Sequence, residues 1–255
     1  MAKIHLIGNA HLDPVWLWRW QEGFSEILAT YRSALDRMNE FPDYKFTSAC
    51  AVYYQWIEKM DKDMFDEICM RIKDGRWCVA GGWFLQPDCN IPSGESLIRQ
   101  FVYGIKFIKN EFGKDCSYLW LPDVFGYSWA LPQILNGCNI HTFMTTKISW
   151  NQYNSIPNDL FNWRGIDGSE VLTYFISTPL DGEDIRNRFA TYNGLITPHS
   201  VIGSWKKFKN KDVSRETLIS YGYGDGGGGV NRDMLKMAHA MQDVPGLPEV
   251  KLSGA

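Results

Sequence analysis

Short apolar segments that resemble β-strands alternate along this chain with longer segments of helical periodicity. The strand-like segments are expected at residues 3–8, 44–50, 76–80, 117–121, 140–145 and 217–222, with a pair of strands within 159–176. Helical periodicity occupies residues 23–39, 52–73, 92–112, 131–135, 199–209 and 232–241. Such alternation is typical of a parallel sheet, open or closed, because each helix returns the chain to the same end of the sheet. No internal repeat or low-complexity linker interrupts the 255 residues, so we place no domain boundary.

Reactive side chains stand at the points where the strand-like segments end. In chain order these candidates are His11, Asp13, Trp83, Asp88, Asp123, Lys147 and Asp225. The C-terminal ends of parallel strands lie at one edge of the sheet, where the loops converge. We therefore expect these residues to gather at a single functional site.

The first motif, residues 8–16, contains His11 and Asp13 two positions apart. In an extended backbone such residues project to the same side, so one imidazole nitrogen and one carboxylate can face a common metal ion. The competing interpretation is that His11 caps a turn while Asp13 begins a helix. In residues 119–128, Asp123 follows an apolar strand and Pro122, among aromatic neighbours. It is a candidate nucleophile or metal ligand, with helix N-capping as the alternative.

A glycine-rich motif follows the last predicted strand, at residues 221–229, and it contains Asp225. Its four successive glycines permit close backbone approach or movement, although a plain flexible turn remains the alternative. A phosphate-binding loop is a weak interpretation because no GKS or GKT sequence follows. The segment 81–96 is long for a strand–helix connection and combines polar groups with Trp83, which is typical of a substrate-binding loop.

Composition excludes several classes of protein. The net charge is −3 and the basic residues are scattered, so we expect neither nucleic-acid nor anionic membrane binding. No segment has the ~18 consecutive apolar residues of a membrane helix, and the strand-like start leaves no room for a signal peptide. Six cysteines without a CxxC pair indicate reduced core residues, and we expect a cytoplasmic protein. Eleven Trp and twelve Tyr would suit sugars, which have apolar faces and polar rims.

Together these segments resemble the N-terminal part of the α-mannosidases of glycoside hydrolase family 38, especially its bacterial and fungal cytosolic branch. The blocks that carry the resemblance are 11–18 (HLDPVWLW), 81–96, 122–127 (PDVFGY), 147–152 (KISWNQ) and 223–229 (YGDGGGG), in the family's order. The resemblance implies a β/α barrel, which we expect to have about seven parallel strands and to be truncated. Residues 1–255 would be the N-terminal catalytic domain, with the family's later domains absent.

The resemblance also implies a bound zinc ion and hydrolysis of the α-mannosidic bonds of a mannose-containing oligosaccharide, with retention of configuration. It implies that His11, Asp13 and Asp123 are zinc ligands, that Asp123 is also the nucleophile, and that Trp16 lines the sugar subsite. We assign the acid/base role provisionally to Asp225. Further substrate contacts are expected from Trp83, Asp88 and Lys147. The oligomeric state is not predicted.

The sequence departs from the family pattern at Gln86, where we would expect a glutamate before Pro87 and Asp88. Family members continue for several hundred residues, and a further histidine ligand lies beyond the region covered by this chain. We therefore expect residues 1–255 alone to hold an incomplete metal site and to have little activity. The rival interpretations are a metal-dependent carbohydrate deacetylase and an inactive carbohydrate-binding fragment.

Overall fold

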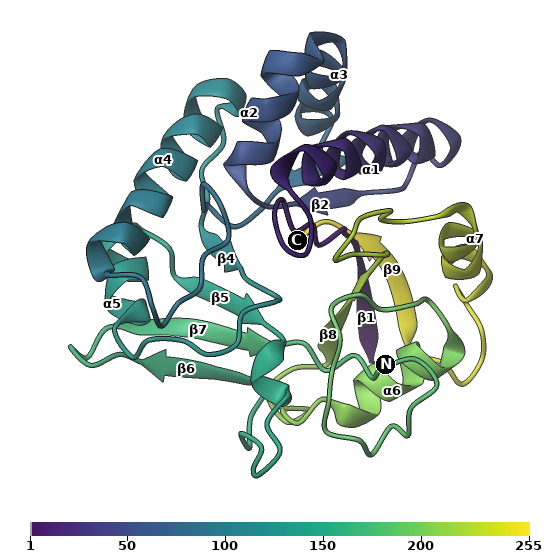
Figure 1. The fold of residues 1–255 in the computed structure, drawn as a ribbon. Helices are drawn as coiled ribbons and strands as arrows, with labels where there is room; N and C mark the ends of the chain where they lie inside the picture. The colour runs from purple at the N-terminus through teal and green to yellow at the C-terminus, as the bar shows by residue number, and fades with distance from the viewer. Residues whose placement is uncertain (1) are drawn as a thin grey trace.

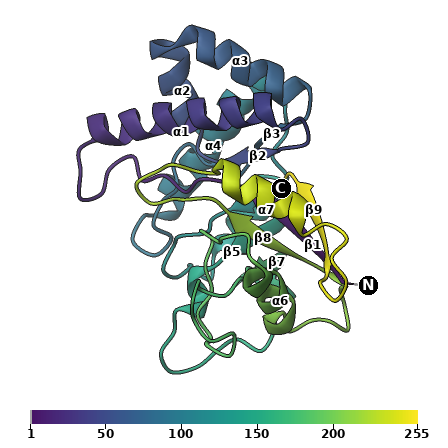
Figure 2. The same ribbon diagram turned by 90° about the vertical axis from the view of Figure 1, so that its right-hand side faces the viewer.

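The computed structural model describes residues 2–255 and is drawn in Figures 1 and 2. Within these residues the strands are β1 (Lys3–Gly8), β2 (Phe46–Ser48), β3 (Trp77–Val79), β4 (Tyr118–Trp120), β5 (Thr142–Thr145), β6 (Leu160–Arg164), β7 (Glu170–Phe175), β8 (Glu216–Tyr221) and β9 (Glu249–Ser253). The helices are α1 (Trp20–Glu40), α2 (Ala51–Met60), α3 (Lys62–Lys73), α4 (Gly94–Phe112), α5 (Leu131–Gly137), α6 (Pro198–Lys207) and α7 (Arg232–Ala240), with a 3₁₀ turn η1 (Lys147–Ser149).

The α/β class and the strand–helix alternation agree with the sequence, but the predicted barrel of about seven parallel strands is wrong. Across residues 2–255 the strands form three open sheets, in the orders β8-β1-β9, β2-β3 and β4-β5-β7-β6. The strand β6 also runs antiparallel to β7. The three sheets follow one another around the molecule without closing into one ladder, as Figure 1 shows.

Side chains and backbone turns separate the sheets. Between β7 and β8, the backbone N–H of Leu218 donates to the hydroxyl of Tyr174 at 3.3 Å, where a neighbouring strand would offer a carbonyl. After β3, Gly81 and Gly82 adopt φ angles of 89° and 70°, which turn the chain away from the strand direction. Because β2, β3 and β4 contain three residues each, they offer few backbone groups for further pairing.

Two local features differ from the sequence prediction. The single helix expected over 52–73 is divided at Asp61, whose side chain accepts a hydrogen bond from Met64 N at 3.0 Å and so begins α3. The strand β9 was not predicted. It pairs in parallel with β1 and alternates exposed with buried residues, a pattern that is hard to recognise over five positions.

A central cluster of buried residues lies where the strands end. Its buried members are Ile7, Ala80, Trp120, Met144, Ile176 and Tyr192, with contributions at or just after β1, β3, β4, β5 and β7, and Leu218 of β8 packs against them. Strand ends that share one core bring the loops that follow them close together. The core therefore places the loops after β1, β4, β5 and β8 near one another.

No helix within residues 2–255 is both long enough and apolar enough to cross a lipid bilayer.

Gly104 in α4 generates a test of this packing. A Cβ atom there would lie 2.2 Å from the carbonyl oxygen of Gly82 and 2.5 Å from the carbonyl carbon of Trp83. We expect Gly104→Ala to lower the free energy of unfolding by about 1–3 kcal/mol, because backbone must move to admit the methyl group. Urea denaturation measures this change. The matched control is Gly137→Ala in α5, where nothing lies within 4 Å of the added atom. Equal effects of the two substitutions would contradict the packing described.

Candidate metal centre

The segment that follows β1 runs beside the segment that follows β8. Leu12 forms bridges with Asp225 and Gly226, and the backbone N–H of Asp13 donates to the Asp225 carbonyl at 3.2 Å. On the other side, the hydroxyl of Tyr53 donates to the Leu12 carbonyl at 2.6 Å. These backbone contacts place Asp13 and Asp225 next to each other, although they lie at opposite ends of the sequence.

Glycine makes this close approach possible. Gly222 has a φ of 124°, and a Cβ atom there would lie 2.1 Å from the carbonyl oxygen of Asn9. No other residue fits a positive φ against a neighbouring backbone at that distance. Asp225 itself has a φ of 62°, which residues other than glycine adopt infrequently. The glycine-rich motif therefore works by close backbone contact.

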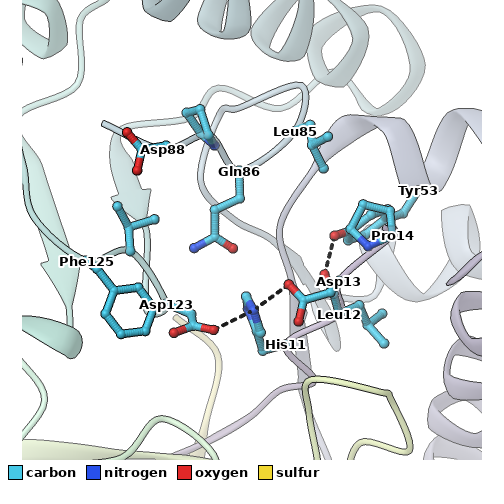
Figure 3. A pocket seen from close by; sticks show the side chains of 12 residues that line it. His11, Leu12, Asp13, Pro14, Tyr53, Leu85, Gln86, Asp88, Asp123 and Phe125 are labelled. Carbon is cyan, nitrogen blue, oxygen red and sulfur yellow. Dashed lines mark hydrogen bonds and ion pairs between the residues drawn. The ribbon is translucent and has the colours of Figure 1, made fainter. Parts of the chain in front are cut away.

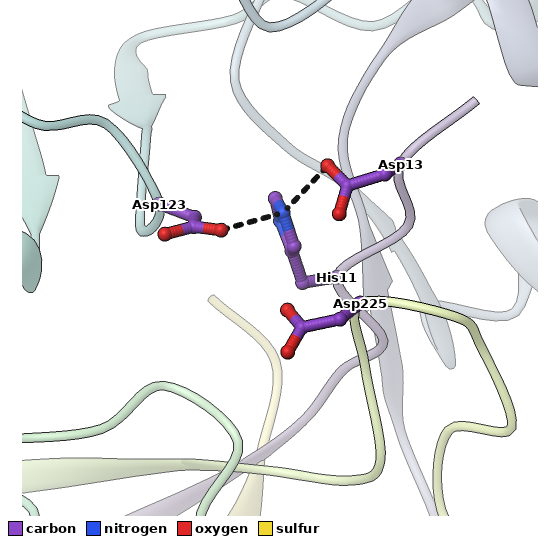
Figure 4. A group of neighbouring side chains, drawn as sticks. All are labelled: His11, Asp13, Asp123 and Asp225. Atoms are coloured by element: carbon purple, nitrogen blue, oxygen red, sulfur yellow. Dashed lines mark ion pairs between the residues drawn. The ribbon is translucent and has the colours of Figure 1, made fainter. Parts of the chain in front are cut away.

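Four side chains converge at this point, as Figure 4 shows: His11, Asp13, Asp123 and Asp225. One possible ligand atom from each lies within 4.8 Å of all the others. The Nε2 atom of His11 is 3.3 Å from Asp13 Oδ1 and 3.3 Å from Asp123 Oδ2. The loop after β4 supplies Asp123, and η1 supplies Lys147, whose Nζ lies 3.2 Å from Asp123 Oδ1.

Burial and charge shape the protonation of this group. Burial by itself lowers the pKa of His11, but the carboxylates of Asp123 and Asp13 outweigh it and raise that pKa to about 9. Burial by itself raises the pKa of Asp123, yet His11, then Tyr192 and Lys147, bring it down to about 2. Asp123 is therefore ionised at neutral pH while largely shielded from water.

The residues present fit a divalent cation. His11 Nε2 is buried without a hydrogen-bond partner of acceptable geometry within residues 2–255, and the buried Asp123 Oδ1 has only the ion pair with Lys147 beside it. Three carboxylates around one imidazole also place like charges close together, which a bound cation would relieve. One nitrogen and several carboxylate oxygens form a donor set suited to zinc or a similar ion. Within residues 2–255, His11 is the group's only histidine.

A cavity of about 180 Å³ opens beside this group. Figure 3 shows Gln86, Asp88 and Phe125 around it, opposite His11 and Asp13. The Oδ1 atom of Asp88 accepts hydrogen bonds from the backbone N–H groups of Asn90 and Ile91, at 2.7 and 2.8 Å. The side-chain nitrogen of Gln86 is buried without a hydrogen-bond partner in the part of the chain that the structure describes. The cavity thus offers polar groups beside an aromatic ring, as a sugar requires.

The structure places the two candidate tryptophans differently. Trp16 is 64% exposed, its ring meets Trp18 edge-on at 5.5 Å, and it does not line the cavity. Trp83 is fully buried, and it stacks on Phe101 with ring centroids 3.9 Å apart. Trp83 therefore belongs to the core beneath the loop and does not line the cavity.

Tyr192 is a site residue that sequence reasoning missed. Its hydroxyl donates to Asp225 Oδ1 at 2.9 Å, and its ring meets His11 edge-on at 5.1 Å. Burial raises its pKa, and the carboxylates of Asp123 and Asp225 raise it further, so the hydroxyl keeps its proton. Tyr192 lies between β7 and α6 in an irregular segment, where neither periodicity nor a strand end marks it.

Comparison with known proteins shows which family the chain resembles. A family model described as "Glycosyl hydrolases family 38 N-terminal domain" matches residues 1–255. Alpha-mannosidase G of Dictyostelium discoideum is 36% identical over 252 residues, which are 99% of this chain and 22% of that protein. Alpha-mannosidase 2C1 of Homo sapiens is 36% identical over 98% of this chain and 23% of its own length. The chain thus spans less than a quarter of these relatives.

Among solved structures, an alpha-mannosidase from Enterococcus faecalis V583 has a similar fold, with a TM-score of 0.75 and 16% sequence identity. The match covers 100% of this chain and 28% of that one. At 16% identity this similarity shows a shared fold and nothing further.

The metal centre can be tested by titrating Co²⁺, whose absorption reports its ligands, into the 255-residue chain. We expect His11→Ala to weaken binding by more than about 100-fold, since even the outer partners of metal ligands contribute about 10–100-fold. His239→Ala is the control, because His239 is exposed and pairs with Asp43 at 2.9 Å. If both variants bind Co²⁺ like the unmodified chain, His11 is not a ligand.

Proposed function

The chain belongs to glycosyl hydrolases family 38, and on this basis we propose that residues 1–255 form the N-terminal catalytic domain of a zinc-dependent α-mannosidase. The observation that carries the proposal is the convergence of His11, Asp13, Asp123 and Asp225 within 4.8 Å, at the ends of strands far apart in sequence. The proposed substrate is a mannose-containing oligosaccharide. The relatives named as α-mannosidases favour this activity over deacetylation of a sugar.

We propose that His11, Asp13 and Asp123 hold the zinc ion, a set supported by the orphaned nitrogen of His11 and by the carboxylates on either side of it. When bound, zinc would supply the positive charge that fixes two neighbouring sugar hydroxyls. Trp16, Asp88 and Lys147 are the proposed substrate contacts. The Lys147 ammonium group faces the rings of Trp150 and Phe125 at 4.0 and 4.8 Å, so its position is well defined.

Asp123 is the proposed nucleophile. Its carboxylate stays ionised beside His11 and Lys147, although its side chain is only 16% exposed. In the proposed reaction, an Asp123 oxygen attacks the anomeric carbon and the glycosidic bond breaks, which forms a covalent glycosyl–enzyme ester. Water then cleaves this ester and releases the sugar.

Asp225 is the proposed acid/base, which protonates the departing oxygen and then removes a proton from the attacking water. Retaining glycosidases place their two carboxyl groups ~5–5.5 Å apart, against ~6.5–9.5 Å in inverting ones. One carboxylate oxygen of Asp123 lies within 4.8 Å of one of Asp225, so the two groups are close enough for the retaining arrangement. The hydrogen bond from Tyr192 occupies Asp225 Oδ1 and leaves the other oxygen to carry the proton. The same proximity makes Asp225 a possible fourth ligand, and experiment can separate the two roles.

The role of Asp123 can be tested in an active enzyme that carries residues 1–255. We expect Asp123→Ala to lower kcat for an aryl α-mannoside by at least about 10⁴-fold, as loss of a nucleophile does elsewhere. Azide added to this variant should yield a β-mannosyl azide, because the small anion attacks once, from the side that the carboxylate occupied. The control is Asp115→Ala, since Asp115 is exposed and pairs with Lys109. Near-normal turnover of Asp123→Ala would rule out the assignment.

The two roles of Asp225 predict different results for Asp225→Ala. An acid/base role predicts a large loss with natural mannosides, a small loss with activated aryl mannosides, and partial rescue by azide with an α-mannosyl azide as product. A ligand role predicts weaker zinc binding and an equal loss on all substrates. Measuring zinc affinity together with kcat for both substrate types decides between them. A uniform small loss with unchanged zinc affinity would contradict both.

A further inference from the structure

A second cavity, with a volume of about 460 Å³, lies between the end of α6, the end of β7 and residues 185–190. None of the four residues of the metal centre lines it. It borders that centre through η1, because Ile148 and Ser149 line the cavity while Lys147 pairs with Asp123. The volume falls within the ~300–1,000 Å³ that is usual for sites that bind small molecules.

Positive charge dominates the wall of this cavity. Five lining residues are cationic and one is acidic: Arg186, Arg188, Lys206, Lys207 and Lys209, against Asp159. Two of the cations are paired, because Lys209 Nζ lies 3.4 Å from Asp159 Oδ1 and Arg186 pairs with Asp184 at 2.5 Å. The other three form no ion pair with any residue in the range 2–255. The cavity therefore has an excess of positive charge.

The environment of Lys207 disfavours the charged form of its own ammonium group. Its Nζ is half-buried and donates to the backbone carbonyls of Asn187, at 2.7 Å, and Phe189. Burial lowers the pKa of Lys207 to about 8, and the nearby charge of Lys209 also lowers it, against an opposing effect of Asp159. The two carbonyls tie the loop to α6 but do not neutralise the ammonium group. A bound anion would compensate for the hydration that the Lys207 ammonium group loses on burial.

Within residues 2–255, the charges of the remaining two cations have no partner that would give them a structural role. Lys206 is exposed, and its ammonium group has no hydrogen-bond partner in the described part of the chain. Arg188 donates to the carbonyl of Gln152 and lies 5.9 Å from the ring of Phe189, which leaves its charge without a counter-ion. The cavity is also lined by apolar side chains, those of Ile148, Ile156, Phe175, Ile176 and Ile185. An anion with a partly apolar body would match this mixture of cationic and apolar lining.

We propose that this cavity binds a small phosphate-bearing molecule, such as a hexose phosphate, through Arg188, Lys206 and Lys207. A planar guanidinium group and two ammonium groups are the donors that phosphate oxygens attract. The cations surround one cavity and do not follow a stripe, and the chain's net charge is −3, which favours a small anion over a nucleic acid. Because Ile148 and Ser149 line it, the cavity is bordered by η1, the same turn that carries the lysine in contact with Asp123.

The test is calorimetric titration of inorganic phosphate, a hexose phosphate and the neutral hexose into the 255-residue chain. A chelator keeps metal ions away, so that the carboxylates of the metal centre repel anions. We expect saturable binding of both phosphates, weakened by added salt, and no binding of the neutral hexose. Tighter binding of the hexose phosphate identifies a sugar phosphate as the ligand class, and equal binding identifies phosphate itself.

The double variant Arg188→Gln/Lys206→Gln leaves the loop contacts of Lys207 intact and should fold. We expect its Kd for phosphate to rise about tenfold or more, as loss of charged hydrogen bonds predicts. The matched control, Lys59→Gln/Lys236→Gln, removes two exposed charges from α2 and α7 and should change Kd by less than about twofold. Absence of saturable binding by the unmodified chain, or an equal loss in both double variants, would overturn the proposal.

Discussion

The backbone contact between the segments that follow β1 and β8 is the constraint on which the site depends. Leu12 pairs with Asp225, and the carbonyl of Asn9 occupies the space that a side chain at position 222 would need. Glycine therefore permits two chain segments, more than 200 residues apart, to lie in contact. His11, Asp13 and Asp225 are brought together by this contact, and Asp123 joins them from the loop after β4. The glycine-rich motif thus contributes by allowing two backbone segments to approach closely, more than by making the loop flexible.

That convergence brings negative charges close together, and the surrounding residues compensate for their repulsion only in part. Three carboxylates lie around one imidazole; Lys147 offsets part of their charge, and Tyr192 donates a hydrogen bond to one of them. The proton on His11 provides further compensation, as its pKa of about 9 indicates. A divalent cation would replace this proton and satisfy the buried nitrogen directly. The low pKa of Asp123 has the same origin, so the fit to a cation and the ionised state of Asp123 arise from one arrangement.

The division into three sheets has consequences beyond the strand count. The side chain of Tyr174 separates β7 from β8, and the connection between these strands contains α6, Tyr192 and most of the wall of the second cavity. An irregular connection of this length can serve two sites, because one part of it reaches the metal centre while another part surrounds the cationic cavity. The turn η1 lies between the two, with Lys147 directed to one and Ile148 to the other.

The sequence by itself determined the class of fold, the approximate place of most strands and helices, and the residue types at the strand ends. These are local properties, because apolar periodicity and turn residues act over a few positions. Only the tertiary structure decided that the sheets stay open, that Trp83 is buried against Phe101, and that Asp225 lies within ligand distance of His11. It also decided the place of Tyr192, whose partner Asp225 is 33 residues away. Each of these outcomes depends on contacts between residues distant in sequence. Local sequence patterns do not predict which of these contacts form, because they do not report the free energy of contacts between distant residues.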